Sequence, residues 1–352
     1  MFESLGFETL TAPQAALIFG GLIGAAFGIL AEITRFCLRR ALVGDAADRR
    51  PALGVWLAAL ASALLGTQAA VATGLVSFAG HRFFAADLPV LAIVAGGLLF
   101  GAGMVLTRGC ASRLTVLSAS GNLRAVFVLL VFAITAHATL KGVLAPLRTS
   151  LGSVTVPFGD TVSLADLPGG ALVWTALLAA TALIVALRSG AHPLHLGLAA
   201  LLGLLVPAAW VGTGFVLFDD FDPIALESLS FTAPFADTLF WAIASTSISA
   251  GFGTGLVGGT LAGAALSSLA GRRFRWQSFE SPRQTGRYTA GAVLMGAGGV
   301  LAGGCTVGAG LAGVPTLSLA AILAITAIAG GALATDRALG RARPSGRTVP
   351  AE

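Results

Sequence analysis

Nine apolar runs of membrane-helix length recur along the chain, and they constrain its fold more than any other feature. They lie at 13–34, 54–78, 89–107, 124–140, 168–187, 194–218, 237–270, 288–310 and 316–334. Each is near the ~20 residues that a helix needs to cross the hydrocarbon core of a bilayer. Only 11% of the 352 residues are charged, so most of the chain cannot be the surface of a soluble domain. We expect an all-α polytopic membrane protein, with residues 1–352 in one transmembrane domain.

The charged residues lie in short loops between these runs, and alternate loops carry opposite signs. The formal net charge of +5 does not indicate nucleic-acid binding, because the arginines are spread over several loops and form no single binding face. Loops rich in Arg and Lys normally stay in the cytoplasm. We therefore expect the N-terminus outside and the C-terminal tail, 341–352, in the cytoplasm.

Two segments of the chain are copies of one glycine-rich unit. Aligned without a gap, "GGLLFGAGMVLTRGC" (96–110) and "GAVLMGAGGVLAGGC" (291–305) share nine identities in fifteen positions. In both copies glycine stands 14, 9, 7 and 1 residues before the cysteine. The alternation of loop charge makes the first copy run towards the cytoplasm and the second away from it. Duplicated units of opposite sense are what an inverted repeat predicts.

Two weaker units extend the repeat. The segment 21–37 keeps Gly28 nine residues before Cys37, and the segment 255–271 aligns with it but has Gly271 where the cysteine would be. We predict two homologous halves, 11–150 and 170–340, related as an inverted repeat. The run 237–270 is too long for one simple span, and a break into two half-helices is expected there.

The glycines before two of the cysteines predict helix breaks. Most glycines serve close packing of membrane helices, but Gly109 and Gly304 directly precede a cysteine. A break there leaves backbone N–H groups free inside the protein, and an anion at the N-terminus of the next half-helix would bind them. The N–H groups in question belong to Ala111, Ser112 and Arg113 in one unit and to Thr306, Val307 and Gly308 in the other.

The three cysteines, Cys37, Cys110 and Cys305, are far apart in sequence, and no CxxC pair occurs. Structural disulfides and a metal site are therefore poorly supported. A buried free cysteine is commonly a small hydrophobic residue. Recurrence of the thiol in related units instead favours a chemical role. A soft, polarizable thiol suits a substrate that carries sulfur better than nitrate or phosphate.

The motifs "RFCLRRAL", "GAGMVLTRGCASRL" and "GRYTAGAVLMGAGGVLAGGCTVGAGLAG" resemble the YeeE/YedE family of membrane proteins, whose characterised members take up thiosulfate. The resemblance covers nearly the whole chain and is most specific at 286–313. It implies an hourglass-shaped, inverted-repeat transporter in the bacterial inner membrane, with no catalysis and no cofactor. It also implies that Cys37, Cys110 and Cys305 line a central path and pass thiosulfate along by S–H contacts with its terminal sulfur.

Two other functions stay open at this stage. One is transport of a different small species, such as another sulfur or selenium compound or a small anion. The other is a membrane thiol oxidoreductase, which fits less well because exchange needs a reactive thiol pair. The basic loop 278–288 is a candidate docking site for a soluble cytoplasmic sulfur carrier protein.

Charged residues near the cysteines have more than one interpretation. Arg35 and Arg108 each stand two residues before a cysteine, where they would draw an anion towards the cytoplasmic mouth or anchor the helix at the interface. Glu32 is an ionisable group late in the first apolar run, and it is functional, is paired with Arg35 or Arg39, or lies at the membrane interface.

Overall fold

The structure is a computed structural model that describes residues 10–159, 161–219 and 222–341. Within these residues, nine helical stretches are long and apolar enough to cross a membrane, as predicted. They are Ala12–Val43, Ala46–Ala72, Val90–Ala119, Leu123–Lys141, Gly170–Leu187, Pro193–Val216, Phe252–Ala270, Pro282–Thr316 and Leu319–Gly340. The all-α polytopic membrane class is confirmed. Apart from residue 341, the predicted tail 341–352 lies outside the described residues.

Several of these spans are composed of more than one helix. The α-helices are α1 (Ala12–Thr34), α2 (Leu38–Val43), α3 (Ala46–Ala72), α4 (Val90–Leu106), α5 (Ala111–Ala119), α6 (Leu123–Lys141), α7 (Ala145–Gly152), α8 (Gly170–Leu187), α9 (Pro193–Val211), α10 (Ala233–Ile243), α11 (Phe252–Ala270), α12 (Pro282–Leu301) and α13 (Leu319–Arg341). The other elements are 3₁₀-helices η2 (Arg82–Phe84), η3 (Leu164–Asp166) and η6 (Val314–Thr316), π-helices η4 (Gly212–Val216) and η5 (Thr306–Gly313), and strands β1 (Asp87–Leu88) and β2 (Val156–Pro157).

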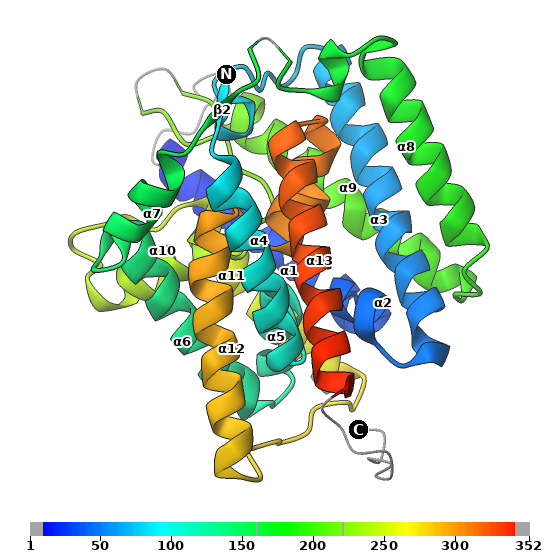
Figure 1. Cartoon of the computed structure of the whole chain (residues 1–352). Coiled ribbons are helices and arrows are strands. Elements are labelled where there is room, and N and C mark those ends of the chain that lie inside the picture. The colour runs from blue at the N-terminus through cyan, green and yellow to red at the C-terminus, as the bar shows by residue number, and fades with distance from the viewer. Residues whose placement is uncertain (1–9, 160, 220–221, 342–352) are drawn as a thin grey trace.

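The two ends of the bundle differ in what they carry (Figure 1). The end drawn at the top, here the upper end, carries the two-stranded antiparallel sheet of β1 and β2, in which Asp87 faces Pro157 and Leu88 faces Val156. The lower end carries the loop 271–281, where Asn122 and Gln277 form an isolated bridge that ties the start of α6 to this loop. Upper and lower are used in this sense throughout.

The duplicated units form α4 and α12, which cross in opposite directions. A Cβ on Gly96 would lie 2.4 Å from the backbone nitrogen of Ala302, and one on Gly103 would lie 2.4 Å from the carbonyl oxygen of Gly291. The start of α4 thus lies against the end of α12, and its end against the first half of α12. Glycine is required at these positions because the two backbones are in contact.

The other repeated glycines also make matching contacts. A Cβ on Gly101 would meet the carbonyl oxygen of Ile328 in α13, and one on Gly296 would lie 2.8 Å from the carbonyl oxygen of Phe132 in α6. More broadly, the main pairs of packed helices are α1 with α11, α3 with α9, α4 with α13, α6 with α12, and α4 with α12. This set is unchanged when α1 is exchanged with α9, α3 with α11, α4 with α12, and α6 with α13. The inverted repeat of two complete halves stays a prediction.

The long apolar run 237–270 is broken, as expected, but not into two half-helices, because α11 alone is long enough to cross a membrane. Helix α10 ends at Ile243, and α11 begins at Phe252. The expected equivalence of segment 255–271 with segment 21–37 does not fit an inverted repeat, because α1 and α11 run parallel. Gly20, Gly24 and Gly28 of α1 approach the backbone of α11 at successively later residues. The shared glycine spacing of these two segments reflects their packing on each other.

Candidate functional site

Each of the three cysteines follows a break between two helices. The break after α1 places Arg35 in the left-handed region with φ 52°, and the breaks after α4 and α12 do the same for Arg108 (60°) and Gly303 (73°). Each of these residues stands two positions before a cysteine. The left-handed residue ends the first helix, and the chain then begins a second, short helix. All three thiols therefore lie at the starts of helices.

The cysteines occupy the N-cap positions of α2, α5 and η5. The backbone N–H of Gly308, three residues on, donates to Sγ of Cys305 at 3.4 Å. At the same offset, the N–H groups of Arg40 and Arg113 are backbone donors near the sulfurs of Cys37 and Cys110. The sulfur thus stands where a Ser or Asp oxygen normally caps a helix. The positive end of each short helix is directed at a thiol.

The three thiols, far apart in sequence, lie together in the interior. The Cys110 thiol neighbours the Cys37 thiol and the hydroxyl of Thr306, and its sulfur is 3.4 Å from Oγ of Ser112. Cys305 is near enough to interact with Cys110. The side chains of the cysteines are at most 5% exposed. The structure therefore brings Cys37, Cys110, Ser112, Thr306 and Cys305 into one buried row.

The other predicted site residues beside the thiols, Ala111, Val307, Gly109 and Gly304, shape the backbone around this row. Ala111 and Val307 are completely buried beside the cysteines. A Cβ on Gly304 would lie 2.9 Å from the nitrogen of Ala309, and one on Gly109 would lie 3.1 Å from the Leu114 side chain. The two glycines let the chain restart its helix within a few residues.

The side chain of Arg113 is a site component that the sequence prediction missed. Its charge acts on the thiols of Cys37 and Cys110 and on Arg35 and Arg40. A guanidinium beside thiols suits an anion. The signal was present in the sequence, because Arg113 follows Cys110 by three residues, which is the same face of a helix. By contrast, Arg108 is exposed and lines neither of the cavities described next.

A cavity of about 440 Å³ opens at the lower end beside this row. Arg35, Arg40, His192, His195 and Arg273 contribute to its lining. Because Arg35 stands two residues before Cys37, the cavity reaches close to that thiol.

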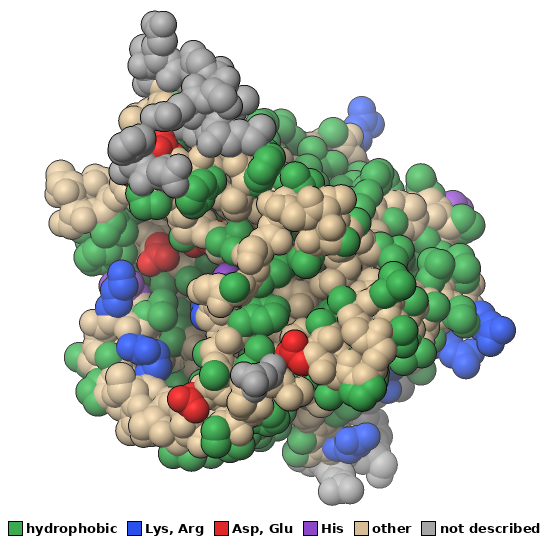
Figure 2. Space-filling view, turned by 90° about the horizontal axis from the view of Figure 1, so that it is seen from above, with side chains coloured by type: hydrophobic (Ala, Val, Ile, Leu, Met, Phe, Trp, Pro, Cys, Tyr) green, Lys and Arg blue, Asp and Glu red, His purple; other side chains and the backbone are tan. Residues whose placement is uncertain are grey.

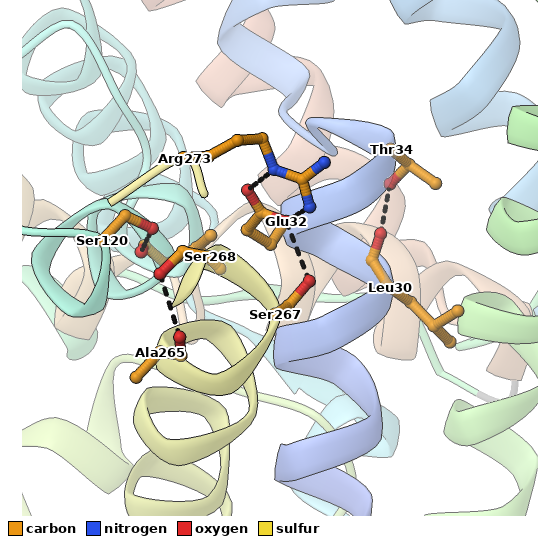
Figure 3. A network of polar contacts seen from close by, with 9 residues as sticks. Leu30, Glu32, Thr34, Ser120, Ala265, Ser267, Ser268 and Arg273 are labelled. Carbon is orange, nitrogen blue, oxygen red and sulfur yellow. Dashed lines mark hydrogen bonds and ion pairs between the residues drawn. The ribbon is translucent and has the colours of Figure 1, made fainter. Parts of the chain in front are cut away.

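A buried carboxylate lies in the wall of the lower cavity (Figure 3). Arg273 donates from Nε to Oε1 of Glu32 at 2.9 Å and from Nη2 to Oε2 at 2.6 Å, and Ser267 donates to Oε2 at 2.9 Å. The expectation that Glu32 pairs with Arg35 or Arg39 is therefore wrong. Its partner is on the loop after α11, which the parallel packing of α1 on α11 brings alongside.

A second cavity, of about 520 Å³, opens at the upper end. Figure 2 looks onto this end and shows charged and histidine side chains around a hollow in the surface. The lining includes His81, Arg82, Glu227 and Ser230, and it reaches Gly308, whose N–H contacts Cys305. The row of thiols thus lies between the two cavities, with Cys305 nearest the upper cavity and Cys37 nearest the lower one.

Comparison with known proteins gives consistent matches over most of the chain. The family described as sulphur transport matches residues 33–334. The thiosulfate transporter TsuA of Escherichia coli (strain K12) is 29% identical over 328 residues, which cover 84% of this chain and 87% of the relative. The thiosulfate transporter TsuA of Spirochaeta thermophila is 27% identical over 260 residues, which cover 66% of this chain and 72% of the relative.

Proposed function

This chain belongs to the sulphur transport family, and from that membership and the geometry of the thiols we propose that it imports thiosulfate across the bacterial inner membrane. The anion enters the upper cavity, passes Cys305, Cys110 and Cys37 in that order, and leaves through the lower cavity. The observation that carries this proposal is the buried row of three thiols between two cavities. The two curated relatives bear the name of a thiosulfate transporter.

The row of thiols carries polar groups that can replace the hydration water of a dianion. Moving a bare charge into a membrane interior is prohibitive unless polar groups replace water. The thiols, the hydroxyls of Ser112 and Thr306 and the guanidinium of Arg113 are such groups. Several weak contacts in sequence favour passage, because the ion must leave each site as readily as it binds.

The charges of the two ends support import from the upper side. Loops at the lower end carry Arg188, Arg272, Arg273 and Arg275, and basic loops stay in the cytoplasm. The upper end is then outside. The basic segment 278–288 belongs to the lower end, and we propose it as the docking surface for a soluble sulfur carrier protein.

A growth assay tests the transport proposal. The host is a bacterium that lacks its own sulfate and thiosulfate importers, supplied with thiosulfate as the only sulfur source. We expect the wild-type chain to restore growth and Cys110→Ala and Cys305→Ala to abolish it at equal membrane abundance. Thr175→Ala, which alters a buried polar residue of α8 that lines neither cavity, is the matched control.

The possible results separate the remaining functions. Full growth with both cysteine variants would show that these thiols serve packing. Absence of growth with abundant wild-type protein would favour another sulfur or selenium species or a small anion, which competition against labelled thiosulfate uptake would identify. Although the thiols of Cys37 and Cys110 are neighbours, we do not propose redox catalysis, because the family is one of transporters.

A further inference from the structure

Arg82 in the upper cavity is a cation without an ion-pair partner among the described residues. It belongs to η2, is exposed to the cavity, and stacks its guanidinium 5.3 Å from the centre of the Phe83 ring. Its charge acts on both Glu227 and the Cys305 thiol. Arg82 therefore places a positive charge in the upper cavity, within reach of Cys305.

Glu227 is fixed in the same cavity by its backbone. The Thr213 hydroxyl accepts from the N–H of Glu227 at 3.1 Å and donates to its carbonyl oxygen at 2.7 Å. The next residue, Ser228, donates to the carbonyl oxygen of Val206 at 3.0 Å. These bonds join the segment to α9 and η4 and hold the backbone of Glu227 in the cavity wall. Glu227 therefore lines the space that an anion would enter.

Other titratable groups surround this pair. Asp237 of α10 faces Glu227, and Asp237 is in turn faced by His137 and Lys141 of α6. His81 lines the cavity beside Arg82, and its burial lowers the pKa of the imidazole to about 4. His81 is therefore neutral near pH 7 and does not supply a positive charge. The charged side chains that line the cavity are those of Arg82 and Glu227, and Asp237 acts on Glu227 without lining the cavity.

We propose that Arg82 captures the incoming anion in the upper cavity and that Glu227 must take up one proton from the outer solution for capture to occur. This inference rests on the proposed import of thiosulfate. An ionised Glu227 repels a dianion and partly neutralises the positive charge of Arg82. The protonated carboxyl does neither. The proton converts one carboxylate to a carboxylic acid, and no other bond changes.

The surroundings of Glu227 raise the pKa of its carboxyl towards the pH of the outer solution. Burial raises the pKa of the Glu227 carboxyl, the charge of Asp237 raises it further, and the charge of Arg82 opposes them. When a bound anion neutralises the charge of Arg82, Arg82 no longer lowers the pKa of Glu227, and this pKa rises further. Proton and anion thus favour each other's binding, as reciprocal linkage requires. Binding tightens as the pH falls, by at most about tenfold per pH unit, because one proton is linked.

Calorimetric binding of thiosulfate to the purified protein in lipid nanodiscs between pH 5 and 8 tests the proposal. The variants are Arg82→Gln, Arg82→Lys and Glu227→Gln. Asp87→Asn and Arg148→Gln, which alter charges outside the cavity lining, are the matched controls. Size-exclusion profiles and melting temperatures confirm that each variant is folded.

We expect Arg82→Gln to weaken binding by about tenfold or more, since a charge-assisted contact is lost. Arg82→Lys should retain part of the affinity, and Glu227→Gln should bind tightly with no dependence on pH. A folded Arg82→Gln protein with wild-type affinity would overturn the proposal, as would a Glu227→Gln protein with the wild-type pH dependence. Uptake of labelled thiosulfate by wild-type proteoliposomes is measured in parallel. If wild-type proteoliposomes take up thiosulfate but Arg82→Gln binds it with wild-type affinity, only this inference is rejected. If wild-type proteoliposomes take up no thiosulfate, the proposed function itself is rejected.

Discussion

At the scale of the residue, two arginines hold a backbone conformation that glycine adopts more easily. Arg35 and Arg108 have φ values of 52° and 60°, and Gly303 occupies the corresponding position of the third break. A side chain in this region costs about 1 kcal/mol relative to glycine. Two of the three breaks therefore carry a backbone strain that glycine removes from the third.

Substitution of Arg108 separates strain from charge. We expect Arg108→Gly to melt at a higher temperature than the wild type, by an amount corresponding to about 1 kcal/mol. Arg108→Ala should melt no higher than the wild type, because alanine keeps the strain. Thiosulfate uptake by both variants should fall equally if the charge matters for transport. Equal melting temperatures for the glycine and alanine variants would contradict the strain argument.

The pair of Glu32 and Arg273 should contribute measurably to stability. Glu32 is 9% exposed, and its carboxylate receives three hydrogen bonds, whereas the Arg273 side chain is 48% exposed. We expect Glu32→Gln to lower the free energy of unfolding by about 1–2 kcal/mol, less than for a fully buried pair because solvent screens Arg273.

The exposed pair of Arg40 and Asp48 provides the comparison. Asp48 is 54% exposed, so Asp48→Asn should cost at most about 0.5 kcal/mol, and 1 M salt should remove most of that cost. Chemical unfolding in detergent at low and high salt measures both effects. A larger loss for Asp48→Asn than for Glu32→Gln would refute this ranking.

The sequence identified some site residues and missed others for physical reasons. Repetition of the Gly-Cys pair singled out Cys110 and Cys305, because a duplicated unit marks selected positions. The predicted partners of Glu32, Arg35 and Arg39, were wrong because the true partner, Arg273, lies 241 residues away in the chain. Arg82 and Glu227 come from separate loops outside the spans, and only the packed bundle places them in one cavity.

At the scale of the element, α1 and α11 are joined by two facing rows of glycine. Gly20, Gly24 and Gly28 lie against the backbone of α11, while Gly255, Gly259 and Gly263 lie against the backbone of α1. Membrane helices gain little from hydrophobic association, so close backbone packing supplies the attraction. The pair forms a rigid unit that carries Glu32 and, three residues beyond the end of α11, Arg273.

Adjacent glycines of α11 test this interlock. A Cβ on Gly259 would collide with the carbonyl oxygen of Gly21, whereas one on Gly258 would meet nothing within 4 Å. We expect Gly259→Ala to destabilise the protein by about 1–3 kcal/mol and Gly258→Ala to be neutral or slightly stabilising. Thermal unfolding of the two purified variants gives the comparison. Similar melting temperatures would argue against the interlock.

Hydropathy predicted the long spans but not their internal breaks in full. The expected break inside 237–270 is present because no single helix of that length fits a bilayer. The short helices α2 and α5 have no apolar signal of their own, and they depend on the left-handed residues before them. Two of those residues are arginines, and arginine does not predict a left-handed backbone.

At the scale of the whole molecule, the number of spans bears on the proposed inverted repeat. Exchange of α1, α3, α4 and α6 with α9, α11, α12 and α13 leaves α8 without a counterpart. Four spans return the chain to the side where it began, and α8 then carries it across once more. We propose that α8 is the linking helix that makes the second set of four start from the opposite side.

The orientation of the molecule can be tested through its exposed ends. Thr155 lies at the upper end and Ser278 at the lower end, and both are exposed. In spheroplasts, a membrane-impermeant maleimide should label Thr155→Cys at once and Ser278→Cys only after lysis. The native cysteines are buried, so the unmodified chain provides a low background. The reverse labelling pattern would place the C-terminal side outside and reverse the proposed direction of the path.

The two cavities also determine where the membrane voltage acts on a passing ion. Water in a cavity conducts, so the electric field is concentrated across the buried section between Gly308 and Arg35. On the proposed path, a dianion would cross most of the voltage there, at a cost of about 4.6 kcal/mol for each 100 mV. The steepest field therefore falls on the three thiols. Voltage dependence of transport is then a property of these few residues and not of the full thickness of the bilayer.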